Sequence, residues 1–108
     1  MSRYLLIESR DPFESRSFSQ RCDLALALRA DGANVTVFLI ENAVLGARAT
    51  ARLREMEKLA KSGVHLLADE FALRERGVGH GDISAAVQPA PLAALIHQLV
   101  AGNKAIWN

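Results

Sequence analysis

The sequence is poor in cysteine and in long apolar runs. Cys22 is its only cysteine in 108 residues, so no intramolecular disulfide can form and an oxidising compartment brings no gain. No apolar run approaches the roughly 20 residues that span a bilayer. Residues 1–8 reach a charge after a short apolar run, without the core of a signal peptide. These absences predict a cytoplasmic protein that does not enter a membrane.

Aromatic residues and net charge are also scarce. Aromatics make up 6% of the chain and the formal net charge is +1, which gives no global attraction to nucleic acid or to an anionic membrane. A local basic set does occur between residues 48 and 61, namely Arg48, Arg52, Arg54, Lys58 and Lys61. Two glutamates dilute it and no aromatic side chain is interleaved for base stacking. We interpret it as a solvated helix face, with contact to tRNA phosphates as the alternative.

Half of the residues are apolar, mostly alanine and leucine. A chain of this size buries about two thirds of its surface on folding, so a core forms without disulfides or metal. Residues 1–108 show no linker, repeat or low-complexity segment, and we predict one domain.

Short apolar runs alternate with helical patterns along the chain. Strands are predicted at residues 4–7, 35–40, 64–67, about 84–87 and 104–107. Helices are predicted from Asp11, as N-cap accepting from the amide of Glu14, to about residue 30, and at residues 49–62, 70–76 and from Pro91. Residues 41–46 are expected to form a loop. The alternation predicts a flavodoxin-like α/β domain with a mainly parallel sheet of four or five strands and helices on both faces.

Two helical segments show clear apolar patterns. Residues 22–30 are apolar on most faces of their helix, so we expect cover on more than one side. In the last helix, one stripe joins Leu92, Leu95, Ile96, Leu99 and Val100. Trp107 and the segment 22–30 together suggest burial against another subunit.

The order of elements and several short motifs resemble the DsrE/DsrF/DsrH family, which includes the TusBCD sulfur-relay proteins. Residues 11–14 (Asp-Pro-Phe-Glu), 22–24 (Cys-Asp-Leu), 41–44 (Glu-Asn-Ala-Val) and 104–107 (Lys-Ala-Ile-Trp) look most like DsrH (TusB-like) chains. Residues 71–78 are similar to the arginine-glycine turn shared across the family. The resemblance covers essentially the whole chain.

The resemblance implies a subunit of an oligomer that passes sulfane sulfur toward tRNA thiolation or sulfur oxidation. In DsrE-like subunits the persulfide-carrying cysteine lies eight residues before the glycine of that turn. Here that position is Asp69, which cannot hold a persulfide. We therefore expect an accessory, non-carrier subunit that associates with DsrE/DsrF-like subunits, with itself or with sulfur-transfer proteins. The alternative is a stand-alone, self-assembling protein that binds a small ligand or protein without sulfur chemistry.

Cys22 is the candidate persulfide thiol of this chain. A relay thiol needs access and nearby positive charge. Arg21 projects about 100° away around the helix, and a mid-helix position has no free amide donors. The competing interpretation is a small core residue, because free cysteine is among the most buried residue types.

Asp69, Glu70 and Glu41 follow predicted strands, at the edge where parallel sheets bind ligands. They are the candidate ligand-binding residues, and hydrolytic or metal-dependent catalysis at this acidic edge is a third, weaker hypothesis. Helix capping is the competing interpretation of Asp69. The histidines, His65, His80 and His97, have no ligand-like spacing, so we predict no metal and no cofactor. Gly77, Gly79 and Gly81 lack the context of a dinucleotide motif and are interpreted as a flexible turn.

Overall fold

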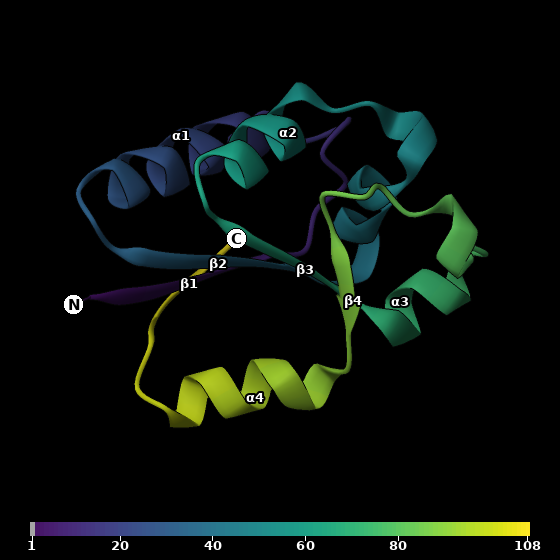
Figure 1. Cartoon of the computed structure of the whole chain (residues 1–108). Coiled ribbons are helices and arrows are strands. Elements are labelled where there is room, and N and C mark those ends of the chain that lie inside the picture. Colours follow the sequence, from purple (N-terminus) through teal and green to yellow (C-terminus); the bar gives the residue numbers. More distant parts are fainter. Residues whose placement is uncertain (1) are drawn as a thin grey trace.

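The sheet is built from short strands that are apolar on both faces. In the computed structural model, which describes residues 2–108, five strands form one sheet in the order β4-β3-β2-β1-β5. They are β1 (Arg3–Glu8), β2 (Asn34–Leu39), β3 (His65–Asp69), β4 (Gln88–Ala90) and β5 (Lys104–Trp107). Every neighbouring pair is parallel. The predicted flavodoxin-like α/β fold is therefore confirmed, with five strands (Figure 1).

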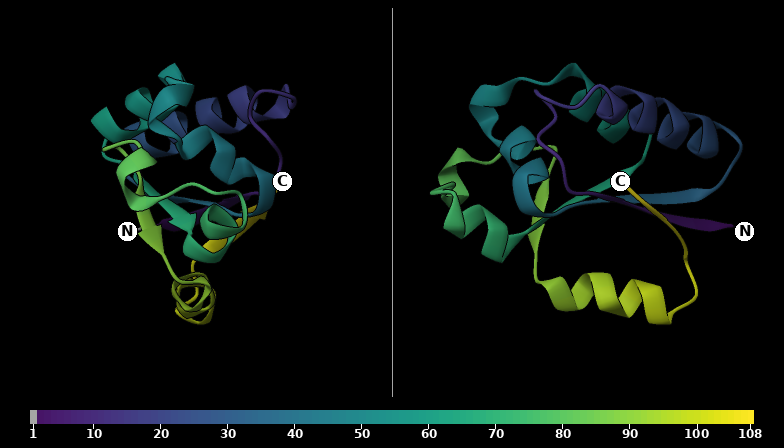
Figure 2. Two further views of the ribbon diagram at one scale, coloured as in Figure 1. Left: turned by 90° about the vertical axis from the view of Figure 1, so that its right-hand side faces the viewer. Right: turned by 180° about the vertical axis from the view of Figure 1, so that it is seen from behind.

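Helices cover the two faces of the sheet unequally. Helices α1 (Ser17–Ala30) and α2 (Arg54–Lys61) lie together on one face, above the sheet in Figure 1. Helix α4 (Leu92–Val100) lies on the opposite face (Figure 2). Helix α3 (Glu70–Glu75) and the 3₁₀ helices η1 (Glu41–Ala47), η2 (Ala49–Ala51) and η3 (His80–Asp82) complete the described elements. Within residues 2–108, α4 is thus the one helix beneath the sheet.

The core is divided by the sheet into two layers. Leu6, Val37 and Leu39 belong to the large layer under α1 and α2, whereas Leu5 and Ile7 belong to a smaller layer against α4. Successive side chains of a strand point to opposite faces. A strand buried on both sides must therefore be a continuous apolar run, as residues 5–7 are.

The first helix begins later than predicted. The Asp11 carboxylate accepts a hydrogen bond from the Phe13 amide at 2.9 Å, not from the amide of Glu14. Glu14 and Ser15 instead donate their amides to the backbone carbonyl of Asp11. This Asx turn competes with helix nucleation, and α1 starts only at Ser17.

The segment between β2 and β3 also differs from the prediction. The expected loop at residues 41–46 is the 3₁₀ helix η1. The helix expected over residues 49–62 is broken at Arg52, whose φ of 51° is left-handed. Only Arg54–Lys61 remains α-helical. A left-handed residue cannot continue a right-handed helix, and propensity alone does not reveal it.

One expectation about an edge element was wrong. The fourth strand lies at Gln88–Ala90 rather than at residues 84–87, and its proline is tolerated because β4 is an edge strand. Of the stripe on α4, only Leu95 is buried. In residues 22–30 of α1, the side chains of Asp23, Ala27 and Ala30 are exposed in the single chain, and cover of that segment by another subunit stays a prediction. No helix among residues 2–108 is long and apolar enough to cross a bilayer.

A buried carboxylate joins the end of β1 to α1 and to residue 108. Glu8 is 2% exposed, accepts from the Asn108 side chain at 3.1 Å and pairs with Arg21 at 3.4 Å. Burial raises the pKa of Glu8, while the hydrogen bond from Asn108 and the charge of Arg21 lower it by less. The native carboxyl group therefore holds its proton to a higher pH than the unfolded chain does.

We predict that Glu8 makes the free energy of unfolding fall as pH rises from about 4.5, its ordinary pKa, through the raised native value. The stabilisation is complete below the unfolded pKa, where both states are protonated, and is lost as the buried group ionises. Urea denaturation between pH 4 and 7 gives the free energy of unfolding of the wild type and of Glu8→Gln. The difference between these two free energies measures the effect of Glu8 at each pH. A difference that stays constant or grows in favour of the wild type with rising pH contradicts the prediction.

Candidate functional site

The carboxyl ends of β2 and β3 open into a cleft of about 230 Å³. Its lining residues are Ile40, Glu41, Asp69, Phe71, Ala72, Glu75, Arg76 and Leu92. The structure thus brings together two of the three predicted carboxylates, Glu41 and Asp69. Glu70 lies elsewhere, in a separate hollow of about 90 Å³ that it shares with Arg74 and His80. We expected all three carboxylates at one edge site, and only Glu41 and Asp69 share one.

Asp69 is held as a helix cap. Its side chain is 8% exposed and accepts a hydrogen bond from the Phe71 amide at 3.3 Å, at the start of α3. The capping interpretation is therefore confirmed. A carboxylate fixed in this way stabilises the turn from β3 into α3, because it satisfies a backbone donor that would otherwise have no partner.

Glu41 also lines this cleft and is exposed. Its φ of 48° lies in the left-handed region, which is unfavourable for a residue with a side chain. In total the lining contains three carboxylates, Glu41, Asp69 and Glu75, and one guanidinium, that of Arg76. It contains no cysteine, serine, lysine or histidine.

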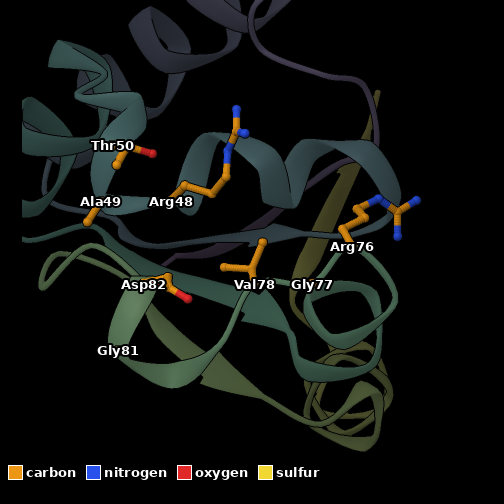
Figure 3. A pocket seen from close by; sticks show the side chains of 8 residues that line it. All are labelled: Arg48, Ala49, Thr50, Arg76, Gly77, Val78, Gly81 and Asp82. Atoms are coloured by element: carbon orange, nitrogen blue, oxygen red, sulfur yellow. The ribbon is translucent and has the colours of Figure 1, made fainter.

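A larger cleft, of about 460 Å³, lies on the other side of the arginine-glycine turn (Figure 3). Its lining residues are Arg48, Ala49, Thr50, Arg76, Gly77, Val78, Gly81 and Asp82. An isolated antiparallel bridge joins Arg48 to Ile83, and the Ser84 amide donates to the Ala47 carbonyl at 2.8 Å. These bonds hold the glycine-rich segment against η1 and η2. The segment interpreted as a flexible turn is therefore one wall of a formed cleft.

Both arginines of this cleft are held by hydrogen bonds along their length. Arg48 Nε donates to the Leu45 carbonyl at 2.8 Å. Arg76 donates from Nε to Asn42 at 3.0 Å and from Nη1 to the Ala72 carbonyl at 3.1 Å. Among residues 2–108 no hydrogen bond is formed by either Nη atom of Arg48 or by Nη2 of Arg76. These remaining donors suit an oxyanion such as a phosphate or carboxylate.

Sequence reasoning missed this cleft. It grouped Arg48 with the basic residues of α2, and it treated Arg76 only as part of a family motif. The break at Arg52 separates Arg48 from the helix and places it beside residues 76–82. The available signal was the arginine-glycine pair at residues 76–77, since Gly77 adopts a φ of 68° that favours glycine.

Cys22 lines neither cleft and lies inside the core layer beneath α1. Its side chain is 5% exposed and neighbours Leu6, Phe18 and Val37. Burial raises its pKa to about 12, with smaller contributions from Glu55, Glu8 and Asp23. A thiol of this kind is almost wholly protonated at neutral pH, so it is a poor nucleophile. The core interpretation of Cys22 agrees with this environment.

No three side chains of histidine, cysteine, aspartate or glutamate within residues 2–108 are grouped so that they could hold a metal ion. His65, His80 and His97 lie on β3, η3 and α4 respectively.

We predict that the Cys22 thiol of the native protein reacts very slowly with a disulfide reagent. At pH 8 a pKa of about 12 in place of 9.0 lowers the thiolate fraction about a thousandfold, and burial restricts access further. Stopped-flow or manual mixing with dithionitrobenzoate checks this, with the protein in denaturant as the fast-reacting control. Native and denatured protein reacting at similar rates would show that the thiol is accessible.

Comparison with solved structures shows where this fold recurs. The YchN protein of E. coli superposes with a TM-score of 0.91 at 19% identity, covering 100% of both chains. A protein of unknown function from Methanobacterium thermoautotrophicum gives 0.84 at 18% identity, covering 99% of this chain and 100% of the other. A conserved protein of unknown function from Bacteroides thetaiotaomicron gives 0.79 at 20% identity, covering 98% and 95%. At such identities the likeness establishes the fold.

Comparison with curated proteins gives no match. The DsrE/DsrF-like family, in contrast, matches residues 2–107, nearly the entire sequence. Together with the parallel five-stranded sheet and the arginine-glycine turn after α3, this match is decisive for the family. The chain is a member of the DsrE/DsrF-like family.

Proposed function

We propose that this protein is an accessory, non-carrier subunit of a cytoplasmic sulfur-relay assembly, closest to the DsrH (TusB-like) subunits. Its partners are DsrE/DsrF-like subunits or further copies of itself, and the assembly serves sulfur transfer of the kind used in tRNA thiolation or sulfur oxidation. Membership of the family supports the relay context. The finer assignment to DsrH-like chains is supported by the motifs at residues 11–14, 22–24 and 104–107.

The observation that carries the non-carrier role is the state of residues 69 and 22. The position at which DsrE-like carriers hold their persulfide is Asp69, a carboxylate occupied in capping α3. The sole thiol, Cys22, is buried and has a pKa of about 12. Sulfur transfer needs an accessible thiolate at the donor and at the acceptor. A subunit with neither contributes its surfaces to the assembly rather than its own sulfur chemistry.

Incubation with inorganic polysulfide followed by native intact-mass spectrometry tests this role. A reactive thiolate would attack a sulfane sulfur, gain one sulfur atom as a persulfide and release a shortened polysulfide. We predict no gain for the folded wild type, because its thiol is protonated and enclosed. We predict a gain for Asp69→Cys in a Cys22→Ser background, because residue 69 lines a cleft of about 230 Å³, whereas Cys22 lies within the core.

Denatured wild type serves as the positive control for Cys22 in that experiment. A sulfur gain by the folded wild type that is lost in Cys22→Ser would overturn the non-carrier role. Circular dichroism of each variant establishes that it is folded before exposure to polysulfide.

A second candidate function is that of a stand-alone protein that binds a small anionic ligand without sulfur chemistry. The larger cleft favours it. Its volume of about 460 Å³ is within the range of small-molecule sites. Arg48 and Arg76 flank the cleft with guanidinium groups anchored to backbone carbonyls, so little side-chain freedom is lost on binding.

For this candidate we predict that pyrophosphate binds at constant ionic strength and that Arg48→Gln weakens binding at least tenfold. Loss of one charge-assisted hydrogen bond of about 1.5–3 kcal/mol accounts for that factor. Isothermal titration calorimetry measures it, with Arg54→Gln as the matched control on the exposed face of α2. Binding that is absent in the wild type, or equally reduced by both substitutions, would contradict an anion site here.

A further inference from the structure

The smaller cleft is built where three neighbouring strands end. The sheet register brings its parts level, because Ala68 pairs with Leu39 and Asp69 pairs with Ala90. Ile40, Asp69 and the turn into α4 therefore meet at the carboxyl end of β2, β3 and β4. In Figure 1, α3 and the start of α4 both lie at that end, on the right. Segments far apart in the sequence thus contribute to one cleft.

The apolar part of the lining remains accessible. Phe71 is 57% exposed and Leu92 is 48% exposed, and Ile40 is half-buried. A ligand with an apolar body would remove this carbon surface from water, which favours binding. The cleft volume of about 230 Å³ lies below the range of drug-sized sites. A body of a few carbon atoms therefore suits it.

The charged part of the lining is mostly negative. Its members are Glu41, Asp69, Glu75 and Arg76. Arg76 donates from Nε to Asn42 and from Nη1 to a backbone carbonyl, and Glu75 is the carboxylate within ion-pair distance of it, at 3.9 Å. Within residues 2–108, neither Glu41 nor Asp69 forms an ion pair. The negative charge of these two side chains is left for a ligand.

Asp69 presents an unused acceptor to this cleft. The residue is 8% exposed, and its Oδ1 atom accepts from the Phe71 amide at 3.3 Å. Within residues 2–108 its Oδ2 atom forms no hydrogen bond, although the side chain lines the cleft. A nearly buried carboxylate oxygen without a donor is costly, and a donor on a ligand would offset that cost. The cap also fixes the carboxylate before any ligand arrives.

The arrangement of the carboxylates favours an organic cation over a metal ion. A metal ion needs several oxygen ligands that converge on one point. No three histidine, cysteine, aspartate or glutamate side chains in the described part of the chain are grouped in that way. An ammonium group has three donors on a flexible stem and tolerates a looser arrangement. It is also attracted to the face of an aromatic ring, and Phe71 lines this cleft.

We propose that the smaller cleft binds an alkylammonium group, a primary amine on an apolar body of a few carbon atoms. The ammonium group donates to Oδ2 of Asp69 and is attracted by the charge of Glu41. The carbon body covers Phe71, Leu92 and Ile40. A free amine and the lysine side chain of a peptide both carry this chemistry. The site goes beyond the functions proposed above, because it differs in place and in ligand charge from the arginine-lined cleft.

Titration with n-pentylammonium chloride, followed by proton–nitrogen correlation NMR at pH 7 and constant ionic strength, tests the proposal. The Phe71 amide is the reporter, since it donates to Asp69. We expect it to shift saturably, with a dissociation constant on the order of 1 mM for so small a ligand. Binding of n-pentanol, which lacks the charge, and of methylammonium, which lacks the carbon body, should be at least tenfold weaker. A blocked lysine tripeptide then competes with n-pentylammonium, and the tighter of the two identifies the source of the amine.

Asp69→Asn is the discriminating variant, because asparagine removes the charge and still caps a helix. We expect it to weaken n-pentylammonium binding at least tenfold. Glu70→Gln is the matched control, since it removes one negative charge from the next residue, which lines a separate hollow. A charge outside the cleft is screened by water and salt, so this control should change the dissociation constant less than threefold.

Three results would overturn the proposal: no saturable shift in the wild type, equal binding of n-pentanol, or an equal loss in both variants. Circular dichroism verifies that both variants fold. The polysulfide experiment follows a sulfur gain and the pyrophosphate titration follows the other cleft. The alkylammonium site and the two proposed functions therefore fail or stand separately.

Discussion

The parallel pairing of β1 with β2 is the constraint on which the rest of this protein depends. Both strands lie inside the sheet, so their apolar side chains must be covered on two faces. Helices α1 and α2 cover one face, and α4 covers part of the other. The polar groups that follow the strands are brought to one edge by the same parallel arrangement. Both the packing and the placement of the clefts follow from this pairing.

The layer beneath α1 determines what Cys22 can do. The helix must bury Phe18, Cys22 and Ala25 to cover β1 and β2. Desolvation in that layer raises the thiol pKa and also that of the neighbouring Glu8. Stability and thiol reactivity are therefore opposed at this position. At residue 69 the conflict is absent, because a carboxylate there both faces a cleft and caps α3. These two residues are the physical basis of the accessory, non-carrier role that we propose.

The helices cover the two faces of the sheet unequally, which leaves exposed apolar side chains on α4 and β5. Among the described residues, the two clefts lie at the carboxyl end of the sheet, near residues 40–50 and 69–82. Leu92, at the start of α4, lines the smaller cleft and is exposed.

The sequence by itself determined the order and type of the elements with regular patterns. Continuous β-branched and leucine runs specified β1 and β2, and Asp69 with Gly77 marked both ends of α3, because these signals are local. Tertiary structure decided the rest. The left-handed Arg52 broke a predicted helix and moved Arg48 to a cleft wall, and the Asx turn at Asp11 delayed α1. Helical periodicity marked the stripe on α4 but not its exposure, since burial depends on which distant elements lie opposite a face. Proximity in space is a property of the assembled sheet, which no local pattern encodes.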